Sequence, residues 1–206
     1  IPSHWVFNTT GKESIGLAYT LTEWTVNDSY SSNKTISNMT APRVGYSFVY
    51  SSPYEWVSTR HLFRDNIMRY TLFPAENVMF NGEEAKFRSY MWNFHGQWDL
   101  IGWEALDISL GYGSMIGNNK VIVNNGERFK ISNPYWGYSL GVEAAIMIPF
   151  GSKGISIKAH AYQNWDFTRK SWKDKDDYGM TPEPLSMKGL TYGLSINYVF
   201  KRYLQK

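Results

Sequence analysis

The sequence has 206 residues, a formal net charge of only +3 and no cysteine. The length predicts one domain over residues 1–206. The small and dispersed charge argues against nucleic-acid binding, and the lack of cysteine excludes disulfides and thiolate metal sites. No motif predicts a metal or another cofactor. The chain begins at Ile1 rather than Met, as a processed precursor or a trimmed piece would.

Two bulk properties together indicate a β-barrel that spans a membrane. The mean hydropathy is −0.41, and no uncharged apolar run approaches the roughly 18 residues of a transmembrane helix. Aromatic residues nevertheless make up 17% of the chain, with 15 Tyr and 9 Trp. Strands that alternate between lipid and a polar lumen explain both values, because half of each strand is polar while aromatic side chains gather at the membrane interfaces.

Six segments alternate apolar side chains with a period of two, as the strands of such a barrel do. They cover residues 14–24, 43–51, 105–113, 136–150, 155–165 and 189–200. Two further strands, at about 67–80 and 83–95, are predicted around Asn81-Gly82, a pair typical of a type I′ hairpin turn. Their outward residues align only with a one-residue bulge, which we place near Pro74. The prediction is an all-β, closed antiparallel transmembrane β-barrel of eight strands.

The two faces of these strands carry different kinds of side chain. The apolar face ends in aromatic residues, which form the predicted girdles at the membrane interfaces: Trp24, Tyr50, Trp136, Tyr138, Phe150, Trp165, Tyr192, Tyr198 and Phe200. The other face carries eight glycines, as expected for an interior just wide enough to be filled by side chains. Its ionisable residues form the predicted lumen network: Arg43, Asp107, Glu143, Lys158 and His160.

The connections between the strands differ in length. Residues 25–42, 114–134 and 166–187 are predicted to be long outer loops, with a small hairpin at Asn125-Gly126, whereas 151–154 is a tight turn. The segment before the third strand allows two interpretations. Ser52-Pro53-Tyr54-Glu55 has the pattern of a helix start, which predicts a short amphipathic helix at the membrane surface around 53–66. Alternatively, the same residues lengthen the third strand.

The last predicted strand alternates apolar residues from Gly189 and ends in Tyr198-Val199-Phe200. It resembles the C-terminal assembly signal of Gram-negative outer-membrane proteins, and most of the chain resembles eight-stranded barrels of the OmpA, OmpX and OmpW type. Six residues follow Phe200, whereas the aromatic residue usually closes such chains. The resemblance implies a bacterial outer-membrane location, periplasmic termini and contact with membrane lipid and lipopolysaccharide. It also implies insertion by the barrel-assembly machinery through the C-terminal strand.

Three hypotheses for the function stay open. The first is a non-enzymatic barrel with a plugged polar lumen, acting through its outer loops in adhesion or surface protection, or as a subunit of a cell-envelope complex. It is favoured because charges in a narrow lumen usually form a satisfied ion-pair network.

The second hypothesis is an outer-membrane enzyme that modifies lipid A or phospholipid, with His160 and Glu143 as an acid–base pair. If Phe150 pairs with Ile155, Glu143 lies opposite Tyr162 and diagonal to His160. The third hypothesis is a narrow pore for small solutes.

Overall fold

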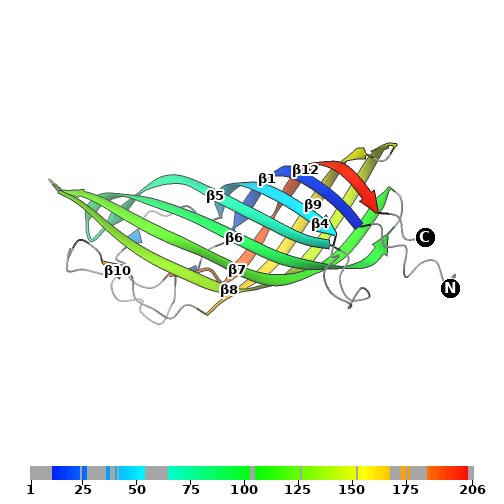
Figure 1. Ribbon diagram of the computed structural model, residues 1–206. Coiled ribbons are helices and arrows are strands. Elements are labelled where there is room, and N and C mark those ends of the chain that lie inside the picture. The colour runs from blue at the N-terminus through cyan, green and yellow to red at the C-terminus, as the bar shows by residue number, and fades with distance from the viewer. Residues whose placement is uncertain are drawn as a thin grey trace.

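The computed structural model describes residues 11–23, 25–26, 36–37, 40, 42–53, 65–102, 105–125, 127–151, 153–167, 173–174, 176 and 185–203. Eight long strands form an antiparallel barrel (Figure 1), in which each pairs with the next and the last pairs with the first. These strands are β1 (Gly11–Thr22), β4 (Arg43–Pro53), β5 (Asp65–Phe80), β6 (Glu83–Gly102), β7 (Leu106–Asn125), β8 (Glu127–Phe150), β9 (Lys153–Asp166) and β12 (Gly189–Tyr203). The predicted closed eight-stranded barrel is confirmed.

Four further strands have two residues each: β2 (Thr25–Val26), β3 (Ile36–Ser37), β10 (Lys173–Asp174) and β11 (Leu185–Ser186). Of these, β3 pairs with β5 and β10 pairs with β8, while β2 and β11 pair with each other. Strands β3 and β10 therefore extend the sheet beside β5 and β8, and β2 and β11 form a separate pair. None of the four takes part in closing the barrel.

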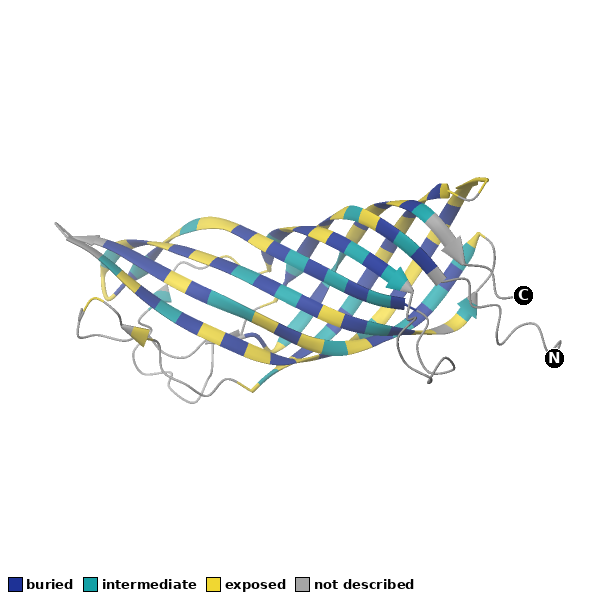
Figure 2. Cartoon of the chain, in the orientation of Figure 1, coloured by how far each residue is buried: buried dark blue, intermediate teal, exposed yellow. Residues whose placement is uncertain are grey.

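Burial alternates from residue to residue along the long strands, which gives the wall its two faces (Figure 2). Leu17 and Ile196 point outward and are 72% and 64% exposed, whereas Thr20 and Asn197 point inward and are fully buried. Successive side chains of a strand point to opposite faces, so the period-two pattern of the sequence becomes an apolar outside and a polar inside.

Strands β5 to β8 are longer than the others and project together at the end of the barrel opposite the start of β1 and the end of β12 (Figure 1). They have 16, 20, 20 and 24 residues, against 11 to 15 in the other four long strands. The prediction of an outer loop over 114–134 was wrong. Strands β7 and β8 continue through it as a paired hairpin until Asn125 pairs with Glu127. Gly126 of the predicted Asn125-Gly126 turn lies outside the described residues.

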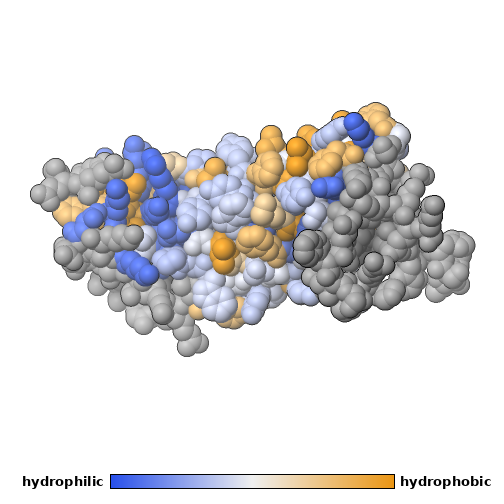
Figure 3. Space-filling model, in the orientation of Figure 1, coloured by the Kyte–Doolittle hydropathy of each residue, from blue (hydrophilic) through white to orange (hydrophobic). Residues whose placement is uncertain are grey.

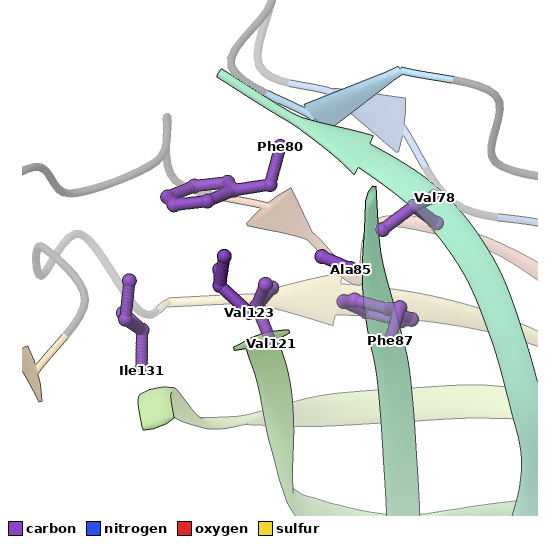
Figure 4. Packing of buried hydrophobic residues seen from close by; sticks show 7 residues of the cluster. All are labelled: Val78, Phe80, Ala85, Phe87, Val121, Val123 and Ile131. Carbon is purple, nitrogen blue, oxygen red and sulfur yellow. The ribbon is translucent and has the colours of Figure 1, made fainter. Parts of the chain in front are cut away.

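The projecting part of the sheet has a hydrophobic cluster of its own (Figure 4), with residues that are at most 5% exposed. Its members come from all four strands: Val78, Phe80, Ala85, Phe87, Val121, Val123 and Ile131. Ile36 of β3 and Phe129 of β8 pack against them. Fully burying side chains of this size stabilises a fold by about 1.5–3 kcal/mol each, which explains why this region forms strands rather than a polar loop.

Strand β5 contains the one-residue bulge predicted near Pro74. Its pairing with β6 shifts between Phe73, which lies opposite Ser89, and Glu76, which lies opposite Phe87. Two residues of β5 therefore face one residue of β6. Proline has no backbone N–H, and a bulge tolerates it because the extra residue there is not paired in the hydrogen-bond ladder.

The predicted type I′ turn at Asn81-Gly82 is confirmed, because both residues have positive φ angles, 50° and 86°. A Cβ added at Gly82 would meet no atom within 4 Å, so only backbone conformation opposes substitution there.

We expect Gly82→Val to lower the free energy of unfolding by about 1–2 kcal/mol, because L-residues are strained at positive φ angles. Urea titration in detergent micelles measures the change. Asn81→Gly serves as the control and should leave stability unchanged, and equal stability of all three proteins would contradict the prediction.

The predicted helix around 53–66 falls mainly on residues 54–64, which lie outside the described residues. On either side of this segment, Pro53 and Asp65 are strand residues that pair with each other. Within the described ranges, no helix is long and apolar enough to cross a membrane.

Candidate functional site

Three side chains, one from β5 and two from the adjacent strands β8 and β9, meet in the barrel interior. Arg69 of β5 donates from Nη2 to Oε1 of Glu143 on β8 over 2.9 Å, and the two side chains are each 2% exposed. The Tyr162 hydroxyl of β9 donates to the same carboxylate oxygen over 2.8 Å. The Arg69 guanidinium also lies over the Tyr162 ring, 5.6 Å from its centroid. These contacts therefore cross the interior rather than following one pair of strands.

His95 of β6 adds a fourth strand to this arrangement. Its ring stacks on Tyr162 with centroids 4.2 Å apart and an interplanar angle of 18°. Its Nε2 is hydrogen-bonded to Oγ of Ser139 on β8. We call Arg69, His95, Glu143 and Tyr162 the central layer. These contacts hold the four side chains in place together, because Tyr162 both stacks on His95 and donates to Glu143, and Glu143 also binds Arg69.

A second ion pair crosses the interior in the half of the barrel where β1 begins. Lys12 Nζ of β1 lies 3.1 Å from Oδ2 of Asp107 on β7, and the two side chains are 7% and 6% exposed. The backbone N–H of Lys12 also donates to Oδ1 of Asp65 on β5 over 3.2 Å. Since β1 and β7 are four strands apart in the ring, this pair joins opposite walls.

On the other side of the central layer, toward the projecting sheet, the interior becomes apolar. A cluster that we call the apolar layer is at most 4% exposed and consists of Phe73, Met91, Met115, Tyr135 and Met187. Above it, Arg43 is ion-paired with Glu76 over 3.3 Å. Its guanidinium lies 5.3 Å and 4.7 Å from the ring centroids of Phe73 and Phe87, so the charge is held between aromatic faces.

The structure places all five residues of the predicted lumen network on the inner face, each at most 6% exposed: Arg43, Asp107, Glu143, Lys158 and His160. Their ion-pair partners are nevertheless residues that the sequence analysis did not name. Glu76 pairs with Arg43, Lys12 with Asp107, and Arg69 with Glu143.

Part of this information was present in the sequence pattern. Arg69 and His95 have inward parity in the predicted strands 67–80 and 83–95, so counting alternate residues would have placed both in the interior. Lys12 lies two residues before the predicted first strand, which begins at Gly11 in the structure. Its inward position would have followed from extending that strand.

Glu143 and His160, the proposed acid–base pair, face each other directly, and the predicted register was wrong by two residues. Phe150 pairs with Lys153 rather than Ile155, which sets Glu143 opposite His160. The physical reason is a tighter turn, since Gly151 has a φ of 63° and β9 already begins at Lys153.

The chemistry of these two residues is not that of an acid–base pair open to a substrate. Glu143 Oε1 accepts hydrogen bonds from Arg69 and Tyr162, whereas neither ring nitrogen of His160 has a hydrogen-bond partner among the described residues. Glu143 and His160 are 3% and 4% exposed. In the described part of the chain, no group of three His, Asp or Glu residues is placed to hold a metal ion.

The predicted girdle residues lie on the outer face wherever the structure describes them, and Trp24 lies outside the described residues. Five of them are 37–59% exposed: Trp136, Tyr138, Phe150, Trp165 and Tyr198. The other three are half-buried: Tyr50, Tyr192 and Phe200. Phe167 contacts two of them, with ring centroids 5.5 Å from Trp136 and 5.1 Å from Tyr138.

The polarity of this barrel is therefore the reverse of that of a soluble protein, with aromatic and aliphatic side chains outside and paired charges inside. A closed antiparallel wall also satisfies its own backbone hydrogen bonds, which a bilayer interior requires. The architecture is that of an outer-membrane β-barrel.

No protein-family model matches the chain, and no curated protein matches it. Among solved structures, the outer-membrane barrel is similar to Ail, the attachment invasion locus protein of Yersinia pestis. That match has 12% identity and a TM-score of 0.45 and covers 96% of this chain and 100% of Ail. The barrel is also similar to the outer membrane protein AlkL in DMPC lipid bilayers, with 12% identity, a TM-score of 0.35, and coverage of 98% and 95%.

Proposed function

We propose that this outer-membrane barrel is closed to solutes and acts at the cell surface through its projecting sheet, in adhesion or surface protection, or as a subunit of an envelope complex. In this proposal the termini are periplasmic and the projecting ends of β5 to β8 are extracellular. Insertion would proceed through the barrel-assembly machinery, which would recognise the C-terminal strand β12.

The observation that carries the proposal is the central layer. Arg69 and Tyr162 are among the largest fully buried side chains of the described residues, and both bind Glu143 across the interior. An interior of eight strands is just wide enough to be filled by side chains. A solute would have to separate a buried ion pair, which is strongly unfavourable, and would then meet the apolar layer.

The same burial argues against the enzyme hypothesis. A lipid substrate outside the wall has no access to His160 or Glu143, and Glu143 is already engaged by Arg69 and Tyr162. A general base must lie within hydrogen-bond reach of the proton that it removes. The surface role is supported instead by the length of β5 to β8, which carry a folded, apolar-cored sheet beyond the rest of the wall.

Planar-bilayer recording tests the proposal. We expect the refolded full chain to insert without producing unitary conductance steps, because the central and apolar layers together occlude the interior. A sixteen-stranded porin reconstituted in the same way provides the positive control, and gel mobility before and after heating verifies that the inserted chain is folded. Reproducible conductance steps from the folded protein would contradict the proposal and favour the pore hypothesis.

A further inference from the structure

The outer face of the projecting sheet carries a cluster of cations that the proposed surface role leaves unexplained. Arg88 of β6 pairs directly with Lys120 of β7, and Lys120 pairs with Ser132 of β8. Paired residues of neighbouring strands point to the same face. One row farther along the strands, Lys86 and Lys130 both pair with Ile122.

The cations of this outer cluster are not neutralised by ion pairs within the described part of the chain. None of Lys86, Arg88, Lys120 and Lys130 forms an ion pair with a residue that the structure describes. Like charges directly opposite each other destabilise a sheet, so the Arg88–Lys120 pair favours binding of an anion. Two acids lie nearby: Glu84 near the β5–β6 turn is exposed on the same strand, and Asp176 accepts a hydrogen bond from the Lys130 backbone N–H over 2.8 Å.

Three of these four cations line a groove of about 370 Å³. Arg88, Lys120 and Lys130 contribute the charges, while Leu72, Tyr90 and Ile122 are among its apolar lining residues. Figure 3 shows hydrophilic side chains gathered at the projecting end of the molecule, next to a paler and more apolar middle. A site of this composition suits a ligand that has both an anionic group and a hydrocarbon part.

The position of the groove along the membrane normal indicates that the ligand is a membrane lipid. Arg88 lies four residues beyond Trp92, whose ring packs against Tyr70 with centroids 4.3 Å apart on the outer aromatic surface. Four residues span about 14 Å along a strand, or roughly 10 Å along the membrane normal at a tilt of about 40°. This distance sets the cations at the depth of lipid headgroups, directly above the aromatic residues.

We propose that this groove binds the phosphate groups of an anionic lipid of the surrounding leaflet. The guanidinium of Arg88 and the ammonium groups of Lys120 and Lys130 would bind the phosphate oxygens. The apolar residues Leu72 and Tyr90 would lie against the upper part of the acyl chains. The inference rests on the proposed orientation of the barrel in the outer membrane, with the projecting sheet outside.

Native mass spectrometry of the refolded full chain in neutral detergent tests the site, with bisphosphorylated lipid A as the probe and dephosphorylated lipid A as the matched ligand control. We expect the wild type to prefer the phosphorylated lipid at least tenfold. Each juxtamembrane cation contributes about fivefold to binding of an anionic lipid, so the triple variant R88Q/K120Q/K130Q should lose about a hundredfold. The control variant K153Q/K188Q removes two cations outside the groove and should bind as the wild type does.

Three outcomes would overturn the inference. These are equal binding of the two lipids, unchanged binding by the triple variant, and equal loss in the control variant. Heparin and inorganic phosphate are tested in parallel. Binding of either of them without binding of lipid A would show that the groove is a site for a soluble anion instead. Liposome insertion of the same samples separates the two proposals. A wild type that inserts but does not prefer the phosphorylated lipid contradicts the phosphate site alone, whereas failure to insert contradicts the membrane-spanning barrel on which both proposals rest.

Discussion

Replacing Arg69 by methionine is expected to lower the free energy of unfolding of the barrel by about 3–5 kcal/mol. The substitution keeps much of the side-chain volume but removes the charge that lies 2.9 Å from Glu143. Breaking a buried ion pair at one partner leaves the other charge desolvated and uncompensated, which costs this amount in proteins. The Tyr162 hydroxyl still binds the carboxylate, but it is a neutral donor and cannot replace the lost cation.

Urea titration in detergent micelles, followed by tryptophan fluorescence and by gel mobility, measures the effect. The double variant R69M/E143L removes both charges and should recover most of the lost stability, because a buried ion pair is often replaced by apolar residues without net cost. Arg88→Met is the matched control, since Arg88 is exposed and unpaired among the described residues. Equal stability of R69M and R88M would show that the central layer does not contribute to folding.

Replacing Gly113 by valine is expected to destabilise the barrel by about 3 kcal/mol or more, at or beyond the upper end of the usual range for overpacking. A Cβ at Gly113 would lie 1.8 Å from the carbonyl oxygen of Phe94 and 2.8 Å from the Cα of His95. Both are backbone atoms of the neighbouring strand β6, so no change of rotamer can relieve the contact. The two strands would have to separate, and the ladder that closes the barrel would be disrupted.

The neighbouring residue provides the control for this prediction. Ser114 lies next to Gly113 on β7 but points outward and is exposed, so Ser114→Val should leave stability nearly unchanged. The folded fraction after refolding, read from heat-dependent gel mobility, compares the two variants with the wild type. Similar folded fractions for G113V and S114V would contradict the close approach of β6 and β7 at this position.

The local geometry of the strands could be predicted from the sequence because it depends on neighbouring residues. Alternation assigned side chains to the two faces, since successive Cβ atoms of any strand point in opposite directions. Asn81-Gly82 predicted a turn because Asn and Gly adopt the two positive φ angles that a type I′ turn requires. Pro74 predicted the bulge because proline has no backbone N–H to donate to a neighbouring strand.

The length of β7 and β8 could not be predicted in this way. The run Gly117-Asn118-Asn119-Lys120 is polar and resembles a loop, yet Asn119 is fully buried and accepts a hydrogen bond from Ser89 of β6 over 2.8 Å. That partner lies 30 residues away in the sequence. Polar residues can continue a strand when the adjacent strand satisfies them, and only the pairing of β6 with β7 provides this.

The sequence by itself determined that this protein is an eight-stranded barrel with an apolar outside and a charged inside, because that information is repeated every two residues. Only the tertiary structure decided which charges meet. Arg69 and Glu143 are 74 positions apart and Lys12 and Asp107 are 95 apart. Their pairing depends on the register of every intervening strand. A register shift of two residues, such as the pairing of Phe150 with Lys153 instead of Ile155, keeps each side chain inside but changes its partner.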